Sequence, residues 1–584
     1  MNKMVQTKTV NTLLLSLREY KKETILSPVY VTLEVIMECI IPLIMASLID
    51  EMTEKSIEPI IKYGIILVIM AILSLIFGVL SGKVAATASC GFAKNIRKDL
   101  YFSIQDFSFA DIDKFSTSSL VTRLTTDVTN LQNAFQMIIR IAVRGPLMIL
   151  FSFAMSFAVN AKMSLIFLAI VPVLAVVLFG ISFYVHPIFN RIFKKYDALN
   201  NSVQENVSGI RVVKSFVREE YETEKFEQAA EDVRKDFTRV EKILALNNPA
   251  MMFCIYLAIL LVSFLGARLI ITSTGTALTT GELSTLINYG VQILSALMML
   301  SMVVVMVTMA SASARRIVEV LQQKPSLAGK ENGLTKVENG DIEFQNVSFR
   351  YSEKAERNTL EGINLHINSG ETIGIIGGTG SSKSSLIQLI PRLYDATEGK
   401  VLVGGKDVKD YEIEGLRNEV AVVLQKNVLF AGTIRENLRW GNKNATDEEL
   451  VRVCKLAQAD EFISQFPNGY DTHIEQGGSN VSGGQKQRLC IARALLKKPK
   501  ILILDDSTSA VDTKTDALIR KAFREEIPDT TKLIIAQRYT SVEDADKILV
   551  LDGGKISGFG TQQEMRVGNR IYREVYESQR KGEQ

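Results

Sequence analysis

Six apolar stretches, each about as long as a membrane is thick, constrain this chain more than any other feature. A helix needs roughly 20 apolar residues to cross the hydrocarbon core of a bilayer, and all six reach that length. In lipid such a segment must satisfy its own backbone hydrogen bonds, which favours the α-helix. The sequence therefore predicts an α-helical membrane domain with six spans, near residues 26–49, 61–80, 138–159, 165–185, 250–271 and 286–307.

The connections between these stretches differ in length and charge. The second and fourth, residues 81–137 and 186–249, are long, polar and rich in lysine and arginine. Positive charge marks the cytoplasmic side of a membrane protein. We therefore expect a multi-pass membrane protein, with both long connections and both termini in the cytoplasm.

Each long connection is predicted to continue the spans as cytoplasmic helices with one interruption. The interruptions lie at residues 108–116 and around Ser208 and Gly209. We expect a short transverse helix at each interruption to touch the soluble C-terminal half of the protein. Solvated hairpins are the alternative.

The overall composition argues against several classes of function. A net charge of +3 over 584 residues gives no basis for nucleic acid as a partner. The five cysteines are scattered without a CxxC pair, so we interpret them as free thiols. The polar, basic N-terminus lacks the apolar core of a removable signal peptide.

Two acidic residues interrupt the first apolar stretch. Glu34 and Glu38 are one helical turn apart and hence on one face of a helix. A carboxylate in hydrocarbon costs roughly 2.5–3.5 kcal/mol on insertion scales, so it should face water or a partner. Two interpretations stay open: attraction of a cationic substrate in a cavity, or pairing with arginines (Arg140, Arg144 or Arg268).

Methionines recur along the sixth stretch, among them Met298 and Met302. Flexible thioether side chains suit a binding surface that accepts varied apolar compounds, so these two are further candidates for a substrate cavity. Ordinary packing between helices is the alternative.

The second half of the chain has the composition of a soluble domain. Apolar strands there alternate with helical segments, which predicts a mostly parallel sheet. We therefore expect an α/β P-loop cassette domain at residues 341–584, joined by a linker at 323–340 to the membrane domain at 1–322.

A glycine-rich segment between a predicted strand and a predicted helix indicates a phosphate-binding loop. In such loops the backbone N–H groups cradle phosphates, a lysine reaches the β- and γ-phosphates, and a hydroxyl holds Mg²⁺. We expect ATP and Mg²⁺ as the ligands, with the loop formed by Gly377, Gly378, Thr379, Gly380, Ser381, Ser382, Lys383, Ser384 and Ser385.

Three further residues lie at or just after the ends of predicted strands, in positions that suit nucleotide binding. Tyr351 ends a strand and is placed to stack on adenine, although it could simply close the strand. Gln425 follows a buried strand and could reach Mg²⁺ or the attacking water. Asp505 ends another apolar strand and is expected to bind Mg²⁺ together with Ser384.

The segment Val481-Ser482-Gly483-Gly484-Gln485 resembles the Leu-Ser-Gly-Gly-Gln signature of ATP-binding cassette ATPases. With six spans, long connections and one cassette, the chain resembles one half of a bacterial cassette exporter. The likeness is greatest to the heterodimeric multidrug exporters. This resemblance implies two cassettes facing head to tail, each ATP lying between one chain's phosphate loop and the other's signature. It also implies an interface loop at Ser509-Ala510-Val511-Asp512 and a segment contacting the transmembrane helices at Glu475-Gln476-Gly477-Gly478.

The chain departs from the family pattern at three positions of its own ATP site. The family has glutamate as general base where this chain has Asp506, and histidine at the γ-phosphate where it has Gln537. Ser382 replaces the glycine before the lysine and adds a Cβ at a position where glycine would allow positive φ without strain. We therefore predict that this site holds ATP and turns it over slowly, since a misplaced base costs roughly 10²–10⁴ in rate.

The signature, by contrast, retains Ser482, Gly483, Gly484 and Gln485, which would complete the competent site of a partner. The predicted function is one subunit of a heterodimeric ATP-driven exporter of amphipathic drugs or similar hydrophobic compounds. A peptide or lipid exporter, a homodimer that tolerates the departures, and a regulatory protein that only senses ATP are the alternatives. An importer is disfavoured because importers generally carry spans and cassettes on separate chains.

Overall fold

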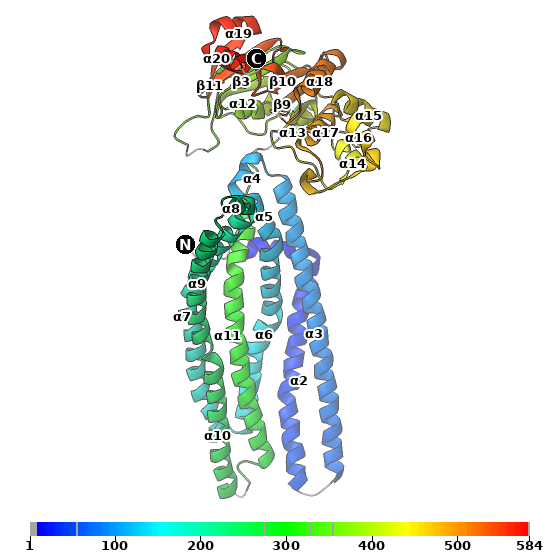
Figure 1. The fold of residues 1–584 in the computed structure, drawn as a ribbon. Helices are drawn as coiled ribbons and strands as arrows, with labels where there is room; N and C mark the ends of the chain where they lie inside the picture. Colours follow the sequence, from blue (N-terminus) through cyan, green and yellow to red (C-terminus); the bar gives the residue numbers. More distant parts are fainter. Residues whose placement is uncertain are drawn as a thin grey trace. The chain divides into compact units, whose positions relative to one another are not determined.

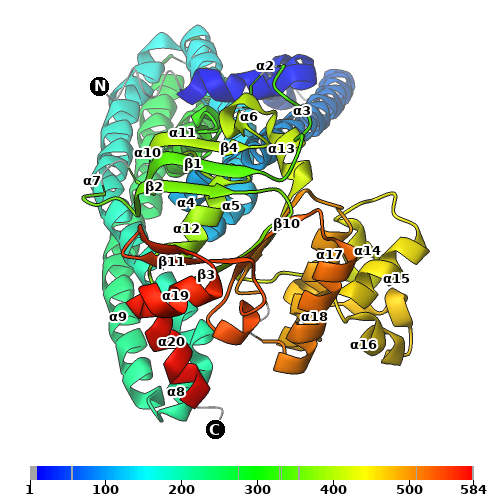
Figure 2. The same cartoon turned by 90° about the horizontal axis from the view of Figure 1, so that it is seen from above.

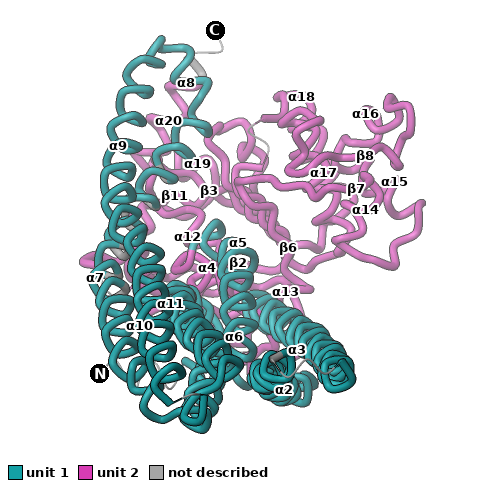
Figure 3. Tube along the Cα trace, turned by 90° about the horizontal axis from the view of Figure 1, so that it is seen from below, with its two compact units in different colours: residues 1–105, 116–323 teal, residues 106–115, 324–584 magenta. Residues whose placement is uncertain are grey.

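The computed structural model describes residues 9–53, 57–273, 275–327, 329–330, 332–352, 355–507 and 510–581. The chain divides into two compact units, shown in different colours in Figure 3. The first comprises Met1–Gln105 and Ser116–Gln323, and the second Asp106–Phe115 and Lys324–Gln584. A ten-residue piece of the first long connection therefore belongs to the second unit.

The first unit consists of long helices that lie side by side (Figure 1). Among the described residues six helical segments are long and apolar enough to cross a membrane, and each contains one predicted stretch. This confirms the prediction of six spans. The principal helices are α2 (Lys21–Thr53), α3 (Ile57–Gln105), α6 (Val128–Val159), α7 (Ala161–Ser208), α10 (Asn247–Ser273) and α11 (Thr280–Gln322), with a short helix η1 (Leu15–Tyr20) before them.

These helices are much longer than a membrane is thick. With 49 residues, α3 is about 74 Å long at 1.5 Å per residue. The hydrocarbon core of a bilayer is about 30 Å thick. More than half of α3 must therefore extend beyond the lipid, as the sequence predicted for both long connections.

Local hydrogen bonds and a close helix contact fix the start of α11. Thr279 and Glu282 form a capping box there, and the Asp50 carboxylate accepts hydrogen bonds from Thr279 Oγ1 (2.7 Å) and Gly281 N (2.9 Å). A Cβ on Gly281 would lie 2.1 Å from the carbonyl oxygen of Ala46 on α2. Only glycine allows these two backbones to approach so closely.

Both predicted interruptions of the long connections are present. In the first, the chain leaves α3, forms the short helix α4 and returns through α5 and a π-helical segment into α6. In the second, α7 ends at Ser208 and a short helix precedes α9. The elements concerned are α4 (Phe109–Phe115), α5 (Thr117–Thr122), the π-helical segment (Arg123–Asp127), α8 (Ile210–Ser215) and α9 (Glu219–Leu244).

The first transverse helix, α4, belongs to the nucleotide-binding unit itself. Phe109 and Ala110 of α4 lie against the hydrophobic core of the second unit, which confirms that prediction. Helix α8 packs against α9 in the first unit, so a contact of α8 with a cassette stays a prediction.

The second unit is an α/β domain built around a six-stranded sheet (Figure 2). Its strand order is β12-β11-β3-β10-β9-β6, and all neighbours are parallel except the edge pair β11 and β12. The predicted parallel sheet is thus confirmed. Its strands are β3 (Thr372–Gly377), β6 (Val420–Val423), β9 (Ile501–Asp505), β10 (Thr531–Ile535), β11 (Lys547–Asp552) and β12 (Lys555–Gly560).

A second sheet and several helices complete this unit. The sheet is antiparallel, with order β2-β1-β4-β5, formed by β1 (Ile342–Phe349), β2 (Leu360–Ile367), β4 (Glu398–Val403) and β5 (Lys406–Asp407). A two-stranded sheet pairs β7 (Gly432–Thr433) with β8 (His473–Ile474). The helices are α12 (Lys383–Leu389), α13 (Ile413–Glu419), α14 (Ile434–Arg439), α15 (Asp447–Leu456), α16 (Asp460–Gln465), α17 (Gly483–Leu495), α18 (Thr513–Glu526), α19 (Gln562–Gly568) and α20 (Arg570–Lys581).

Candidate ATP site and signature

The topology of the six-stranded sheet brings the predicted ATP-site residues together. Strands β3, β10 and β9 are parallel neighbours, and their register aligns Ile375 with Ile535 and Ile535 with Asp505. The phosphate loop follows β3, Asp505 ends β9, and Gln537 comes two residues after β10. All three therefore lie at the carboxyl edge of the sheet, where parallel α/β folds bind ligands.

The phosphate loop combines a tight backbone approach with open space. A Cβ on Gly377 would lie 2.3 Å from the carbonyl oxygen of Leu551, so only glycine fits there. Gly378 and Gly380 have nothing within 4 Å of an added Cβ, and Gly380 has a φ of +82°. The loop therefore leaves room beside its backbone, as a cradle for phosphate groups requires.

Ser382 adopts the left-handed conformation that glycine favours. Its φ is 71° and its ψ is 24°, and it caps α12 without a side-chain hydrogen bond. A Cβ in this region costs roughly 1–2 kcal/mol. The replacement of glycine therefore places strain directly before the phosphate-binding lysine.

Lys383 is held at the mouth of this loop. Its ammonium donates hydrogen bonds to the carbonyl oxygens of Gly377 and Gly378, both at 2.8 Å, and to Ser381 Oγ at 3.2 Å. Burial lowers the pKa of Lys383, while the nearby carboxylates of Asp505, which ends β9, and of Asp506, which follows it, act in the opposite direction. This is the cation that would contact the β- and γ-phosphates of ATP.

Ser384 and Asp505 face each other as a pair suited to Mg²⁺. Ser384 Oγ donates a hydrogen bond of 3.1 Å to Asp505 Oδ1. Burial raises the pKa of Asp505, and the Ser384 hydrogen bond partly offsets this. Gln425 is exposed two residues beyond β6, the strand next to β9, so it lies on the same edge of the sheet.

The two altered catalytic positions contact each other. Gln537 Nε2 donates a hydrogen bond of 2.8 Å to Asp506 Oδ2. Asp506 also has a positive φ of 50°. Burial raises the pKa of Asp506, whereas the hydrogen bond from Gln537 and the charge of Lys383 lower it. A short carboxylate and an amide thus stand where the family places glutamate and histidine.

Tyr351 lies beside the helix that follows the phosphate loop. The residue is 48% exposed, and its hydroxyl oxygen is 2.9 Å from Ser385 Oγ and donates to Gln388 Oε1 at 3.2 Å. Edge-to-face contact with Tyr394, at a centroid distance of 5.1 Å, supports the ring. An exposed, supported aromatic ring here is suited to stack on adenine.

Tyr394 joins this aromatic group to α4, a connection that sequence reasoning missed. Its hydroxyl donates a hydrogen bond of 2.7 Å to Asp113, and its ring meets Phe109 edge-on at 6.0 Å. Burial and the Asp113 contact raise the pKa of Tyr394. Tyr394 belongs to no motif, so only the interruption at residues 108–116 pointed towards it.

The signature forms the well-capped N-terminus of α17. Ser482 Oγ accepts a hydrogen bond from Gln485 N at 3.2 Å, and Gln485 Oε1 accepts one from Ser482 N at 2.9 Å. This reciprocal capping box leaves Gly483 and Gly484 in the first helical turn. A helix N-terminus of this kind binds anions through its N–H groups and dipole.

The loop after β9 packs against the signature helix. A Cβ on Gly484 would lie 2.8 Å from the Ala510 carbonyl oxygen, and Ala510 N donates to Gln487 Oε1 at 3.1 Å. Ser509, the first residue of the expected interface loop, lies outside the described residues. In the segment 475–478, the carbonyl oxygen of Gly477 accepts a 2.7 Å hydrogen bond from Lys486 of α17.

The acidic pair in the first span is neutralised in part by an arginine of α6. Arg144 donates to Glu34 Oε1 at 2.5 Å and to both carboxylate oxygens of Glu38 at 2.7 Å. Of the two interpretations left open, the structure thus shows the pairing with Arg144. Met298 and Met302 are 41% and 61% exposed in the single chain, so packing within this chain does not account for them.

Comparisons with known proteins agree with this architecture. Residues 24–297 match the ABC transporter transmembrane region, and residues 360–509 match the ABC transporter family. The chain is 38% identical over 547 residues to the uncharacterized ABC transporter ATP-binding protein YfiB of Bacillus subtilis (strain 168), covering 94% of each protein. It is 31% identical over 495 residues to the ATP-dependent lipid A-core flippase of Desulfotalea psychrophila, covering 83% of this chain and 84% of the flippase.

A solved structure has the same fold. The structure of a bacterial Atm1-family ABC exporter with ATP bound superposes with a TM-score of 0.83 at 22% identity. The match covers 96% of this chain and 99% of the exporter. At this identity the comparison establishes the shared fold only.

Proposed function

The chain belongs to the ABC transporter family and has the exporter architecture, and from this premise we propose that it is the degenerate-site subunit of a heterodimeric exporter. As in its family, ATP hydrolysis is coupled to transport. The proposal assigns slow turnover to the ATP site on this chain's own phosphate loop. It assigns productive turnover to a site that this chain's signature completes on a partner.

The hydrogen bond between Gln537 and Asp506 carries the proposal. A general base must reach the attacking water in a bound complex, and a carboxylate one methylene shorter than glutamate falls short of that position. The Gln537 amide donates a hydrogen bond of 2.8 Å to Asp506 Oδ2, which further restricts the movement of the carboxylate towards the water. Glutamine lacks the imidazole that would contact the γ-phosphate, so both altered groups disfavour hydrolysis while leaving ATP binding possible.

The residues that would hold ATP and Mg²⁺ fit those ligands. The N–H groups of the loop and the Lys383 ammonium would hold the phosphates, and Tyr351 would stack on adenine. Mg²⁺ would be held by Ser384 and Asp505, with Gln425 from the neighbouring strand. When bound, Mg²⁺ would neutralise charge on the β- and γ-phosphates. The groups that would bind ATP are present, whereas the groups that would hydrolyse it are altered. This combination favours a site that retains ATP.

We further propose the orientation expected from charge, with both long connections, both termini and the cassette in the cytoplasm of a bacterium. The cargo proposed is an amphipathic or hydrophobic compound. Exposed Met298 and Met302 on α11 support an apolar binding surface. The Glu34–Arg144–Glu38 cluster has a formal charge of −1, which favours a cationic compound over an anionic one. A lipid is the second candidate, since one relative of similar length is named a lipid A-core flippase.

ATPase activity of the chain alone and of the complex from its native membrane tests the proposal. We expect an inactive lone chain and an active two-component complex. Robust activity of the lone chain would favour the homodimer and overturn the degenerate-site assignment. Stimulation of the complex by cationic dyes, short peptides or lipid vesicles would then separate the candidate cargoes.

A further inference from the structure

The chain passes between its two compact units at three places. It leaves the first unit after Gln105, returns at Ser116, and leaves again after Gln323. A movement of the second unit can pass along the chain to the membrane helices at these crossings, through α3, through α5 and α6, and through the end of α11. The side chains near these crossings decide whether those helices move separately or together.

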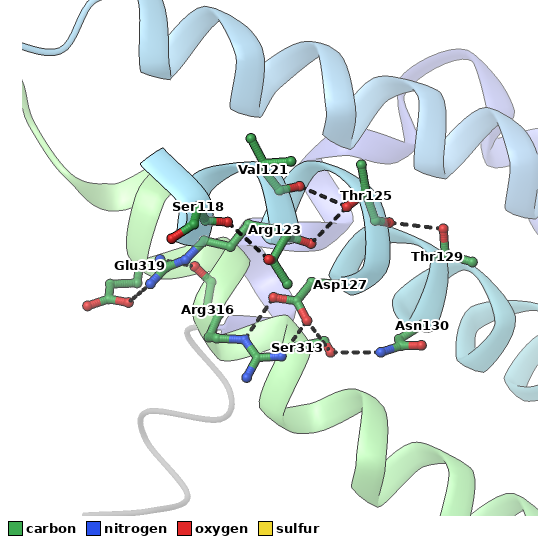
Figure 4. A network of polar contacts seen from close by, with 11 residues as sticks. Ser118, Val121, Arg123, Thr125, Asp127, Thr129, Asn130, Ser313, Arg316 and Glu319 are labelled. Carbon is green, nitrogen blue, oxygen red and sulfur yellow. Dashed lines mark hydrogen bonds and ion pairs between the residues drawn. The ribbon is translucent and has the colours of Figure 1, made fainter. Parts of the chain in front are cut away.

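In the first unit, a buried aspartate ties α6 to α11 close to two of the crossings (Figure 4). Asp127 is fully buried at the end of the π-helical segment. Its carboxylate accepts hydrogen bonds from Arg316 Nε at 2.7 Å and from Ser313 Oγ at 2.8 Å, and it also contacts Arg316 Nη2. Asn130 adds a bond of 3.3 Å to Ser313 Oγ.

A second arginine extends this tie towards the end of α11. Arg123 begins the π-helical segment and is 7% exposed. Its guanidinium donates to the carbonyl oxygen of Arg316 at 2.7 Å and forms an ion pair with Glu319 at 2.9 Å (Figure 4). Charge-assisted hydrogen bonds with bidentate geometry resist rotation better than single neutral ones. The two helices are thus held at several consecutive turns.

In the second unit, another buried aspartate ties the same two stretches of chain on the other side of the crossings. Asp111 of α4 is 3% exposed and accepts hydrogen bonds from the backbone N–H of Ser108 (3.1 Å) and of Ser326 (2.9 Å). The hydroxyl oxygens of Ser108 and Ser326 lie 2.5 Å apart. Burial would raise the pKa of Asp111, but the hydrogen bonds from Ser326 and Ser108 outweigh it and lower the pKa.

We propose that Asp127 and Asp111 are positioning residues for the coupling of ATP hydrolysis to transport. Each forms its hydrogen bonds in a different unit, so the chain is held together on both sides of the crossings. As a result α6 and α11 move together when the second unit moves. A flexible junction would instead let each crossing absorb the movement separately. The proposal requires only that the chain is an ABC exporter and is independent of the heterodimer.

The test compares Asp127→Asn with the parent in the purified complex. Hydrogen exchange of the whole chain is measured without nucleotide, with ATP, and with ATP plus vanadate. In the parent we expect nucleotide to change exchange in both α6 and α11. In Asp127→Asn we expect the changes in residues 324–584 to persist, ATPase activity to stay within about threefold, and the change in α6 to fall at least fivefold, because a lost charged hydrogen bond weakens a local contact by about one order of magnitude.

Asp236→Asn is the matched control. Asp236 of α9 is also held by a bidentate arginine, with Arg191 Nη2 at 2.7 Å and Nε at 3.1 Å, and by Lys195 at 3.0 Å, but these residues are remote in sequence from all three crossings. This variant should retain the parent's exchange changes in α6 and α11. An equal loss of the exchange change in α6 in both variants would mean that the Asp127 hydrogen bonds only stabilise the fold in general, and it would overturn the proposal.

A milder variant keeps the proposal testable if Asp127→Asn does not fold. Glu319→Gln removes one charge from a side chain that is 55% exposed, so the fold should tolerate it. We expect a loss of about twofold in the α6 response, in the same direction. The proposal would be contradicted if the α6 response were unchanged in a folded variant. It would also be contradicted if nucleotide did not change hydrogen exchange in α6 and α11 of the parent.

Discussion

The two ends of the cassette that handle ATP differ in how well their geometry suits the task. At the phosphate-loop end, Ser382 and Asp506 are both held at positive φ, 71° and 50°, and Asp506 is engaged by Gln537. At the signature end, Ser482 and Gln485 form a reciprocal capping box, in which each side chain accepts a hydrogen bond from the other residue's backbone N–H. One end carries backbone strain and the departures proposed to slow catalysis, whereas the signature residues from Ser482 to Gln485 carry neither.

The difference shows that the two ends can change independently within one fold. The signature is stabilised by hydrogen bonds between neighbouring residues of α17, which do not involve the phosphate loop. The catalytic positions instead depend on three separate strands meeting at one edge. A cassette can therefore lose its own catalysis and still present an intact signature to another chain.

The largest expected effect is loss of activity on damaging the signature. A Cβ at Gly483 meets only Ala510 Cβ, at 3.5 Å, so the fold accepts a side chain there. Gly483→Asp would place a carboxylate against the phosphates bound by the partner, and we expect ATPase activity of the complex to fall about 100-fold or more. Lys383→Ala in this chain's own loop should cost less than about threefold. A reversed ranking of the two variants would break the comparison.

Restoring the catalytic groups should produce the next largest effect. Asp506→Glu with Gln537→His supplies a longer carboxylate and an imidazole. In a complex whose partner site is disabled, we expect ATPase activity to rise by about 10–100-fold. Each single variant serves as a control and should gain less. A double variant that folds, binds ATP and stays inactive would contradict the assignment of slow turnover to these two positions.

Relieving the strain at Ser382 should have a smaller effect. Ser382→Gly removes a Cβ from a left-handed position, where it costs roughly 1–2 kcal/mol, and only the part of this strain that is felt when phosphate binds can affect affinity. We expect ATP to bind this chain's site up to about fivefold more tightly, measured by equilibrium titration. Ser382→Ala retains the Cβ and should show no gain. Equal affinities for all three proteins would indicate that the strain does not reach the phosphates.

The smallest expected effect concerns pH and Asp505. Because burial raises its pKa in the fold, the ionised carboxylate is less favourable there than in the unfolded chain. The associated stability is present below the unfolded pKa of about 3.9 and is lost as pH rises through the folded value. Asp505→Asn should therefore raise the melting temperature of the nucleotide-free complex at pH 7, on the order of 1–3 °C. The gain should shrink towards pH 4, and a gain that grew on acidification would contradict this assignment.

Much of the fold follows from patterns that are local in the sequence. Hydropathy identified all six spans because each spanning segment must itself be apolar and must satisfy its own backbone hydrogen bonds in lipid. The interruptions of both long connections were visible for the same reason, since turn-forming residues act locally. The strain at Ser382 was anticipated because the phosphate loop demands a particular backbone whatever surrounds it.

Contacts between distant residues were beyond such patterns. The sequence left three arginines as partners for Glu34 and Glu38, and packing of α2 on α6 selected Arg144. Tyr394 meets Asp113 across 281 positions of sequence, and no local signal marks either residue. Which partner is chosen depends on how whole helices and strands are packed.

The sequence by itself thus determined the six spans, the phosphate loop, the signature and the departures from the family pattern, because each is a property of a short segment and its chemistry. Only the tertiary structure decided that α4 belongs to the nucleotide-binding unit, that Gln537 engages Asp506, and that Asp127 ties α6 to α11. The physical reason is that charges and hydrogen-bonding groups, once buried, must find partners among whichever side chains the packing brings within reach.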